Sequence, residues 1–122
     1  MAWQVADDTP WIALNSSRSE QTFREWGRTI SWLDNALVVH PGEDGMVVVR
    51  WRSPAAARVD FTFAFADAYP SGGGDGIAWF VEIDDANRTL ASGQIERGGP
   101  ATGLRSLTEI EVAQGENIHF SC

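Results

Sequence analysis

The chain has 122 residues, a length that corresponds to a single domain. Hydrophobic residues make up 43% of it, and 6 Trp with 6 Phe supply large apolar side chains for a core, which argues against a disordered chain. The net charge of −8 disfavours nucleic acid and anionic lipid surfaces as partners, because both repel an acidic protein.

The first 35 residues have no clear periodicity, and irregular structure with short strands is the preferred interpretation of them. Residues 19–26 fit either a helical turn or a strand. Asn15-Ser16-Ser17 matches a glycosylation sequon, as does Asn87-Arg88-Thr89, although such short patterns also arise by chance. The start lacks the basic and apolar regions of a signal peptide, which leaves an intracellular protein or an export signal outside these residues.

Alternation of apolar and polar residues dominates from residue 36 onward, and it predicts strands with one buried face. In residues 59–65, a Val and three Phe share one face, while Asp, Thr and Ala share the other. Residues 77–84 repeat this pattern, with Phe80 and Glu82 opposite four apolar side chains. The apolar residues expected to face a core in this and the last two segments are Ile77, Trp79, Val81, Ile83, Ile110, Val112, Ile118 and Phe120.

Turn signals separate the predicted strands. Residues 41–45 predict a hairpin that joins residues 37–39 to residues 46–49, because glycine is available where φ must be positive. Residues 85–87 and 113–116 predict two further turns, and Ser53-Pro54 ends the strand before it because proline cannot donate a ladder hydrogen bond. No stretch of about 18 apolar residues is present, so no membrane span is expected. These signals predict an all-β, antiparallel β-sandwich formed by one domain over residues 1–122.

Several motifs occur in an order that is typical of one group of proteins. They are His40-Pro41-Gly42, residues 47–54, the alternating residues 59–65, Gly74-Asp75-Gly76-Ile77 and residues 115–120. Over residues 36–120 the chain resembles small bacterial jelly-roll modules, related to carbohydrate-binding modules, of secreted or surface multidomain proteins. The resemblance implies a jelly-roll-like β-sandwich, a secreted or surface location, and a non-catalytic carbohydrate- or ligand-binding function.

Such modules usually continue into one further strand, whereas this sequence ends at Cys122. The resemblance therefore leaves two possibilities open. The chain is a fragment that lacks a C-terminal strand, or its sheet is completed by a strand of a neighbouring chain. An open sheet edge would allow a homo-oligomer, so a structural module that self-associates is the second interpretation. Cys122 is the single cysteine, which excludes an internal disulfide and leaves either an inert residue or a link between two chains.

An enzyme is a third and weaker interpretation. Glu82-Ile83-Asp84 is similar to the Glu-x-Asp-x-(x)-Glu strand of laminarinase-like glycoside hydrolases, but Ala86 or Asn87 stands at the second glutamate. Retaining hydrolysis needs two carboxyl groups about 5 to 5.5 Å apart, so the missing acid argues against it. No serine has the Gly-x-Ser-x-Gly turn, and His40 and His119 lack the spacing of a metal site. We therefore predict no catalytic residue.

Ligand binding would need an exposed ring that stacks on the apolar face of a sugar, with polar groups beside it. Trp51 and Trp79 are expected in the core. The candidate binding residues are Trp32, Tyr69, Phe80 and Glu82. Near the glycine-rich residues 71–76, the carboxylates of Asp67 and Asp75 offer hard oxygen ligands for a structural calcium ion, although turns favour the same residues. No other cofactor is expected.

Overall fold

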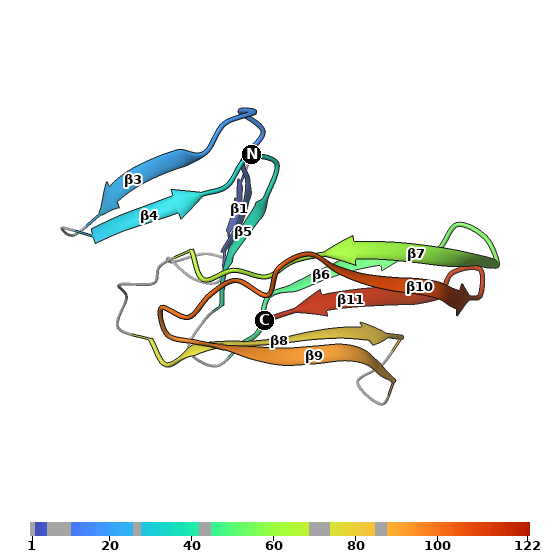
Figure 1. Cartoon of the computed structure of the whole chain (residues 1–122). Helices are drawn as coiled ribbons and strands as arrows, with labels where there is room; N and C mark the ends of the chain where they lie inside the picture. The colour runs from blue at the N-terminus through green and yellow to red at the C-terminus, as the bar shows by residue number, and fades with distance from the viewer. Residues whose placement is uncertain (1, 5–10, 26–27, 42–44, 69–73, 85–87) are drawn as a thin grey trace.

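The computed structural model describes residues 2–4, 11–25, 28–41, 45–68, 74–84 and 88–122 (Figure 1). All secondary-structure elements in these ranges are β-strands, and all their pairings are antiparallel. The predicted all-β class is therefore confirmed. No helix in the described ranges is long and apolar enough to cross a bilayer. The strands are β1 (Ala2–Gln4), β2 (Trp11–Leu14), β3 (Gln21–Glu25), β4 (Arg28–Trp32), β5 (Leu37–His40), β6 (Val48–Arg52), β7 (Ala57–Phe63), β8 (Gly76–Ile83), β9 (Thr89–Glu96), β10 (Arg105–Val112) and β11 (Asn117–Ser121).

Strands β6 to β11 form two stacked sheets. One sheet has four strands in the order β6-β11-β8-β9, and the other is the pair β10-β7, which lies on the opposite side of the core (Figure 1). The pairings are nested along the chain: β8 pairs with β9, β7 with β10, and β6 with β11. Two antiparallel sheets packed face to face fit a β-sandwich.

The hydrophobic core lies between these two sheets. The largest fully buried side chains are Trp79, Val81 and Ile83 of β8 and Ile118 of β11. Alternate residues of β7 and β10 pack against them from the other sheet. Each such aliphatic or aromatic side chain contributes about 1.5 to 3 kcal/mol when it is fully removed from water, so the alternation predicted from the sequence supplies most of the driving force.

An aromatic cluster surrounds Trp79. The ring of Phe65 stacks on the indole with 4.9 Å between centroids, and Phe63 meets it edge-on at 5.9 Å. The Arg105 guanidinium lies over the indole at 5.3 Å from the ring centroid. On β9 the residue paired with Trp79 is Gly93, where an added Cβ would lie 2.6 Å from Cζ2 of the indole. The indole therefore fits because its cross-strand neighbour has no side chain.

The N-terminal part forms two smaller sheets, β1-β2-β5 and the hairpin β3-β4, which extends away from the sandwich (Figure 1). The buried Asn15 joins them. Its Nδ2 donates to the carbonyl oxygens of Ser19, Trp32 and Leu33 at 2.9 to 3.0 Å. Its Oδ1 accepts from the Ser17 amide and hydroxyl. The amide is therefore used within the fold rather than presented to solvent.

One expectation about strand pairing is wrong. The predicted hairpin between residues 37–39 and 46–49 does not form, because β5 pairs with β2 and β6 pairs with β11. The last strand, β11, lies inside its sheet with β6 and β8 on either side. In the described part of the chain, the outer strands of the four-stranded sheet are β6 and β9.

Candidate functional site

The four-stranded sheet has a face that points away from β7 and β10, which we call the outer face. Along β8, the residues on the core side are buried, while Phe80 and Glu82 lie on the outer face and are half-buried. Because side chains alternate between the two faces of a strand, β11 places His119 and Ser121 on the same face as these two residues. Two of the four predicted ligand-binding residues are therefore on one surface.

The strand register arranges one row of small and apolar residues across the outer face. We call this row the apolar row, and it consists of Val48, Ser121, Phe80 and Ser92 on β6, β11, β8 and β9. Phe80 is the only aromatic member, and both of its direct cross-strand neighbours are serines. Within the described ranges no other aromatic ring contacts Phe80. The short neighbours leave the Phe80 ring partly accessible to solvent.

A second row of hydrogen-bonding residues lies beside the first, two residues along each of β6, β11 and β8. We call it the polar row, and it consists of Arg50, His119, Glu82 and Thr89. The Thr89 hydroxyl donates to Glu82 Oε1 at 3.4 Å. The Nε2 atom of His119 is buried and has no hydrogen-bond partner in the described part of the chain. The row thus places a carboxylate, a hydroxyl and a guanidinium beside an imidazole whose Nε2 is buried.

The end of β8 is fastened to the start of β11 by Asp84. The Asp84 carboxylate accepts hydrogen bonds from the backbone N–H and from Nδ2 of Asn117, both at 3.0 Å, and its own N–H donates to the Asn117 carbonyl at 2.8 Å. The two hydrogen bonds from Asn117, with a smaller effect from His119, lower the pKa of Asp84 from its usual value of 3.8. Asp84 has a φ of 53°, a left-handed conformation that Asp tolerates better than most residues. Asp84 is therefore a structural residue at the margin of the polar row.

Trp32, the third predicted binding residue that the structure describes, is not part of the outer face. Trp32 lies on β4, in the hairpin that extends from the sandwich, and its carbonyl accepts from Asn15. Figure 1 shows β4 well separated from β8. Tyr69 lies outside the described residues. The four predicted residues therefore do not form a single surface.

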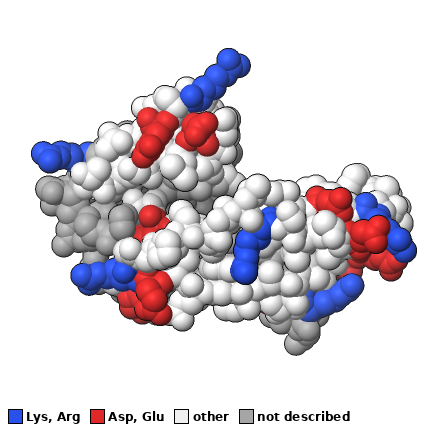
Figure 2. Space-filling view, viewed as in Figure 1, with Lys and Arg blue, Asp and Glu red and all other residues white. Residues whose placement is uncertain are grey.

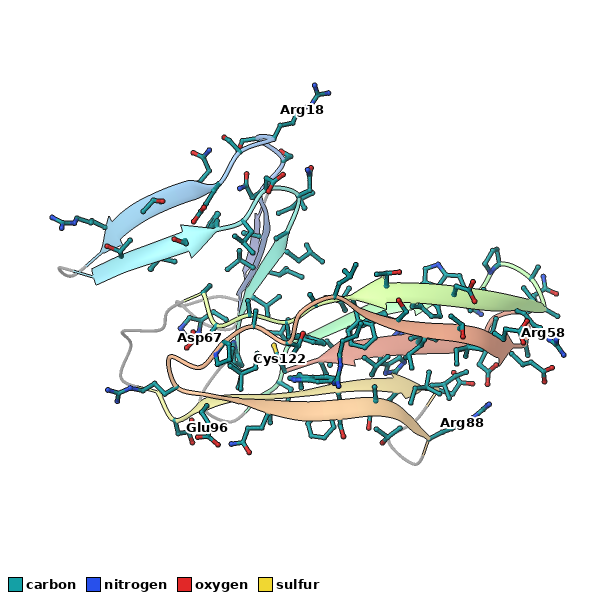
Figure 3. The ribbon with its side chains drawn as sticks, viewed as in Figure 1. Arg18, Arg58, Asp67, Arg88, Glu96 and Cys122 are labelled. Carbon is teal, nitrogen blue, oxygen red and sulfur yellow. The ribbon has the colours of Figure 1, made fainter. Side chains whose placement is uncertain are left out.

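The two predicted calcium ligands lie near the loop end of the sandwich. The Asp67 carboxylate accepts from the Gly98 amide at 3.4 Å, and Figure 3 shows Asp67 and Glu96 at the end of the sandwich opposite Arg58. Asp75 is exposed just before β8. Among the described residues, no three Asp, Glu, His or Cys side chains converge in a way that could hold a metal ion. The described geometry gives no support for a calcium site.

Six members of the two rows were not predicted as site residues: Val48, Arg50, Thr89, Ser92, His119 and Ser121. The alternation in residues 117–121 places His119 and Ser121 opposite Ile118 and Phe120. It does not reveal that β11 lies against β8, because that pairing joins segments far apart in the sequence. The strand register determines which residues lie beside Phe80, and the alternation pattern does not contain this information.

Cys122 follows the last strand and packs against the core (Figure 3). Its backbone exchanges two hydrogen bonds with Val47, at 2.9 and 3.2 Å, which continues the pairing of β6 with β11. Burial raises the pKa of the Cys122 thiol. A thiol that is half-buried and kept protonated is a weak nucleophile, which favours the inert role over a link between chains.

Charged side chains do not gather in one region of the surface shown in Figure 2, where acidic and basic groups alternate. Comparison of the chain with known protein families, curated proteins and solved structures found no match. The functional argument therefore rests on the geometry of the outer face.

Proposed function

We propose that this protein is a non-catalytic, jelly-roll-like β-sandwich module that binds carbohydrate reversibly on its outer face. The observation that carries the proposal is the apolar row lying directly beside the polar row. A pyranose ring has an apolar face and a rim of hydroxyl groups. An aromatic ring next to hydrogen-bonding side chains complements both features, as in other ligand sites where a few polar groups orient an apolar contact.

Phe80 would provide the stacking surface. The ring is half-buried, so its position is fixed by the sheet, and its serine neighbours do not cover it. Burial of its remaining exposed area by a sugar would be favourable at about 25 cal/mol per Å² of apolar surface. A rigid, preformed surface also loses little conformational entropy on binding.

The polar row would orient the bound sugar through hydrogen bonds. Glu82 accepts hydrogen bonds and already receives one from Thr89, and the pair can exchange that contact for sugar hydroxyls. His119 lies between Glu82 and Arg50 in the row, but its Nε2 is buried, so the direct contacts to a sugar would come from Glu82 and Thr89. These groups stand one row away from Phe80, about 7 Å along the strands.

The nested strand pairing supports the jelly-roll part of the proposal. A jelly roll is a long antiparallel hairpin wrapped into two sheets, and the pairs β6–β11, β7–β10 and β8–β9 follow that scheme. The four-stranded sheet adds the pairing of β11 with β8, which closes the wrap on one side. A full jelly roll has eight strands, so the six here would represent a reduced form.

The enzyme alternative finds little support in the same residues. The Glu82 carboxylate has His119 and Thr89 as its cross-strand neighbours, and the nearby Asp84 carboxylate is held by two hydrogen bonds from Asn117. A glycosidase needs one carboxyl group to act as acid and a second as nucleophile or base. If a hydrolase activity depended on this face, Glu82→Gln would abolish it.

Self-association through a sheet edge is the other alternative. Each outer strand has a feature that natural proteins use against edge pairing: β6 carries two exposed arginines, and the pairings of β9 and β10 contain register shifts. We therefore favour ligand binding over self-association. A dimer in light scattering that persists at low protein concentration would reverse this order.

The test is affinity gel electrophoresis against soluble β-glucan, xylan, mannan and pectin. We expect retardation by at least one polysaccharide for the wild type, and loss of it in Phe80→Ala. Leu104→Ala is the matched control, because Leu104 is 79% exposed and lies outside the outer face. Retardation that is absent for all four polysaccharides, or unchanged in Phe80→Ala, would contradict the proposal.

A further inference from the structure

Arg50 lies at the end of the polar row, and none of the carboxylates that the structure describes forms an ion pair with it. It is exposed on β6, and its cross-strand neighbour is His119. Among the described residues, the Arg50 side chain has neither an ion pair nor a hydrogen bond, whereas its backbone is part of the β6–β11 ladder. The ion pairs of that part are Arg58–Glu111 and Arg88–Glu116.

The acidic residues that the structure describes in or beside this row already accept hydrogen bonds. Glu82 lies one strand beyond His119 and accepts from Thr89, while the Asp84 carboxylate accepts twice from Asn117. The strand register places the Arg50 guanidinium next to His119, whose Nε2 has no partner among the described residues. A guanidinium has a planar fork of N–H donors that matches a carboxylate with two parallel hydrogen bonds.

We propose that the saccharide taken by the outer face is acidic, and that Arg50 binds the carboxylate of a uronic acid unit. This inference rests on the proposed function. Arg50 is two strands and one row away from Phe80, a Cα separation of about 12 Å in an ordinary sheet. That distance exceeds one pyranose ring, so the ligand is an oligosaccharide with one sugar on Phe80 and a uronate on Arg50.

The overall charge narrows the class of ligand further. At −8 the protein repels a densely charged polyanion, whereas a single carboxylate at Arg50 meets a local positive charge. The fitting ligand is therefore a largely neutral glycan that carries occasional uronates. Glucuronoxylan has this character, whereas alginate and polygalacturonate carry a carboxylate on every sugar.

The experiment compares each of these three polysaccharides with its carboxyl-reduced form, using isothermal titration calorimetry on the folded chain. We expect glucuronoxylan to bind about tenfold more tightly than its reduced form, the effect of one charge-assisted pair. Arg50→Gln should lower the affinity for glucuronoxylan to that for its reduced form, so that the difference between the two forms disappears. Arg18→Gln is the matched control, because Arg18 lies in the loop between β2 and β3, away from the outer face (Figure 3).

The outcomes separate this inference from the proposed function. Equal affinity for acidic and reduced forms, both lost in Phe80→Ala, would overturn the role of Arg50 and keep carbohydrate binding. A preference for the acidic form that survives Arg50→Gln would also overturn it. Failure of every polysaccharide to bind, or binding unaffected by Phe80→Ala, would overturn both.

Discussion

Replacing Gly93 with alanine tests the packing that fixes the four-stranded sheet. The new Cβ would lie 2.6 Å from Cζ2, 2.8 Å from Cε2 and 3.0 Å from Nε1 of the Trp79 indole. Trp79 is only 1% exposed, and Phe65 stacks on its ring at 4.9 Å, so the surrounding side chains restrict movement of the indole away from the new Cβ. Overpacking of this kind costs about 1 to 3 kcal/mol.

The measurement is the free energy of unfolding from urea titration followed by circular dichroism. For a chain of this size, a loss of about 2 kcal/mol lowers Tm by roughly 6 to 12 °C. Gly45→Ala is the matched control, because an added Cβ at Gly45 meets nothing within 4 Å. We expect that variant to stay within about 0.5 kcal/mol of the wild type.

A double-mutant cycle with Trp79→Phe identifies the clash directly. The smaller ring removes indole atoms that the Gly93→Ala Cβ would meet, so the two changes should compensate each other by about 0.5 to 3 kcal/mol. Additive effects of the two substitutions, or a Gly93→Ala protein as stable as the wild type, would refute the assigned contact between β8 and β9.

Three further substitutions test local structure. Asp84→Asn keeps a side chain that tolerates positive φ but removes the charge. Because Asn117 holds the pKa of Asp84 below 3.8, the wild type should be more stable than the variant above that pH and should lose this advantage as the pH falls through the lower folded-state pKa. Tm measured for both proteins from about pH 7 to pH 2 checks this, and a difference that stays constant over the range would contradict it. Asn15→Ala leaves three carbonyl groups without their donor and should cost the hairpin β3-β4 about 1 to 3 kcal/mol of protection in amide hydrogen exchange, whereas unchanged exchange would contradict its joining role. Asp60→Ala removes the acceptor of the Glu109 amide, 2.8 Å away at the irregular pairing of β7 with β10, and should lower the free energy of unfolding by about 1 kcal/mol, while Asp60→Asn should retain most of it.

The sequence predicts burial well because alternation is a local property. Trp79, Val81 and Ile83 were expected on one face from their spacing alone, and they are among the most buried side chains of the fold. Placing Phe80 and Glu82 on the opposite face follows from the same spacing. Side chains alternate between the two faces of a strand whichever strand is its neighbour, so the prediction of faces does not depend on strand pairing.

Pairing and register are the properties that local patterns do not encode. The turn signal at residues 41–45 favours a hairpin, yet longer-range contacts give β5 and β6 other partners. For the same reason the neighbours of Phe80 were missed, since Ser121 reaches it from the last strand. Asn15 shows the limit of motif matching, because a sequon contains no information about burial.

The central claim is that ligand contacts occur on the outer face around Phe80. The most direct measurement is a backbone amide NMR titration of the folded chain with xylohexaose, cellohexaose, mannohexaose and an aldouronic xylo-oligosaccharide. We predict that at least one ligand shifts the amides of β8 and β11 at Phe80, His119 and Ser121, while those of β7 and β10 stay in place. Shifts confined to β7 and β10, or none with any of the four oligosaccharides, would contradict the account.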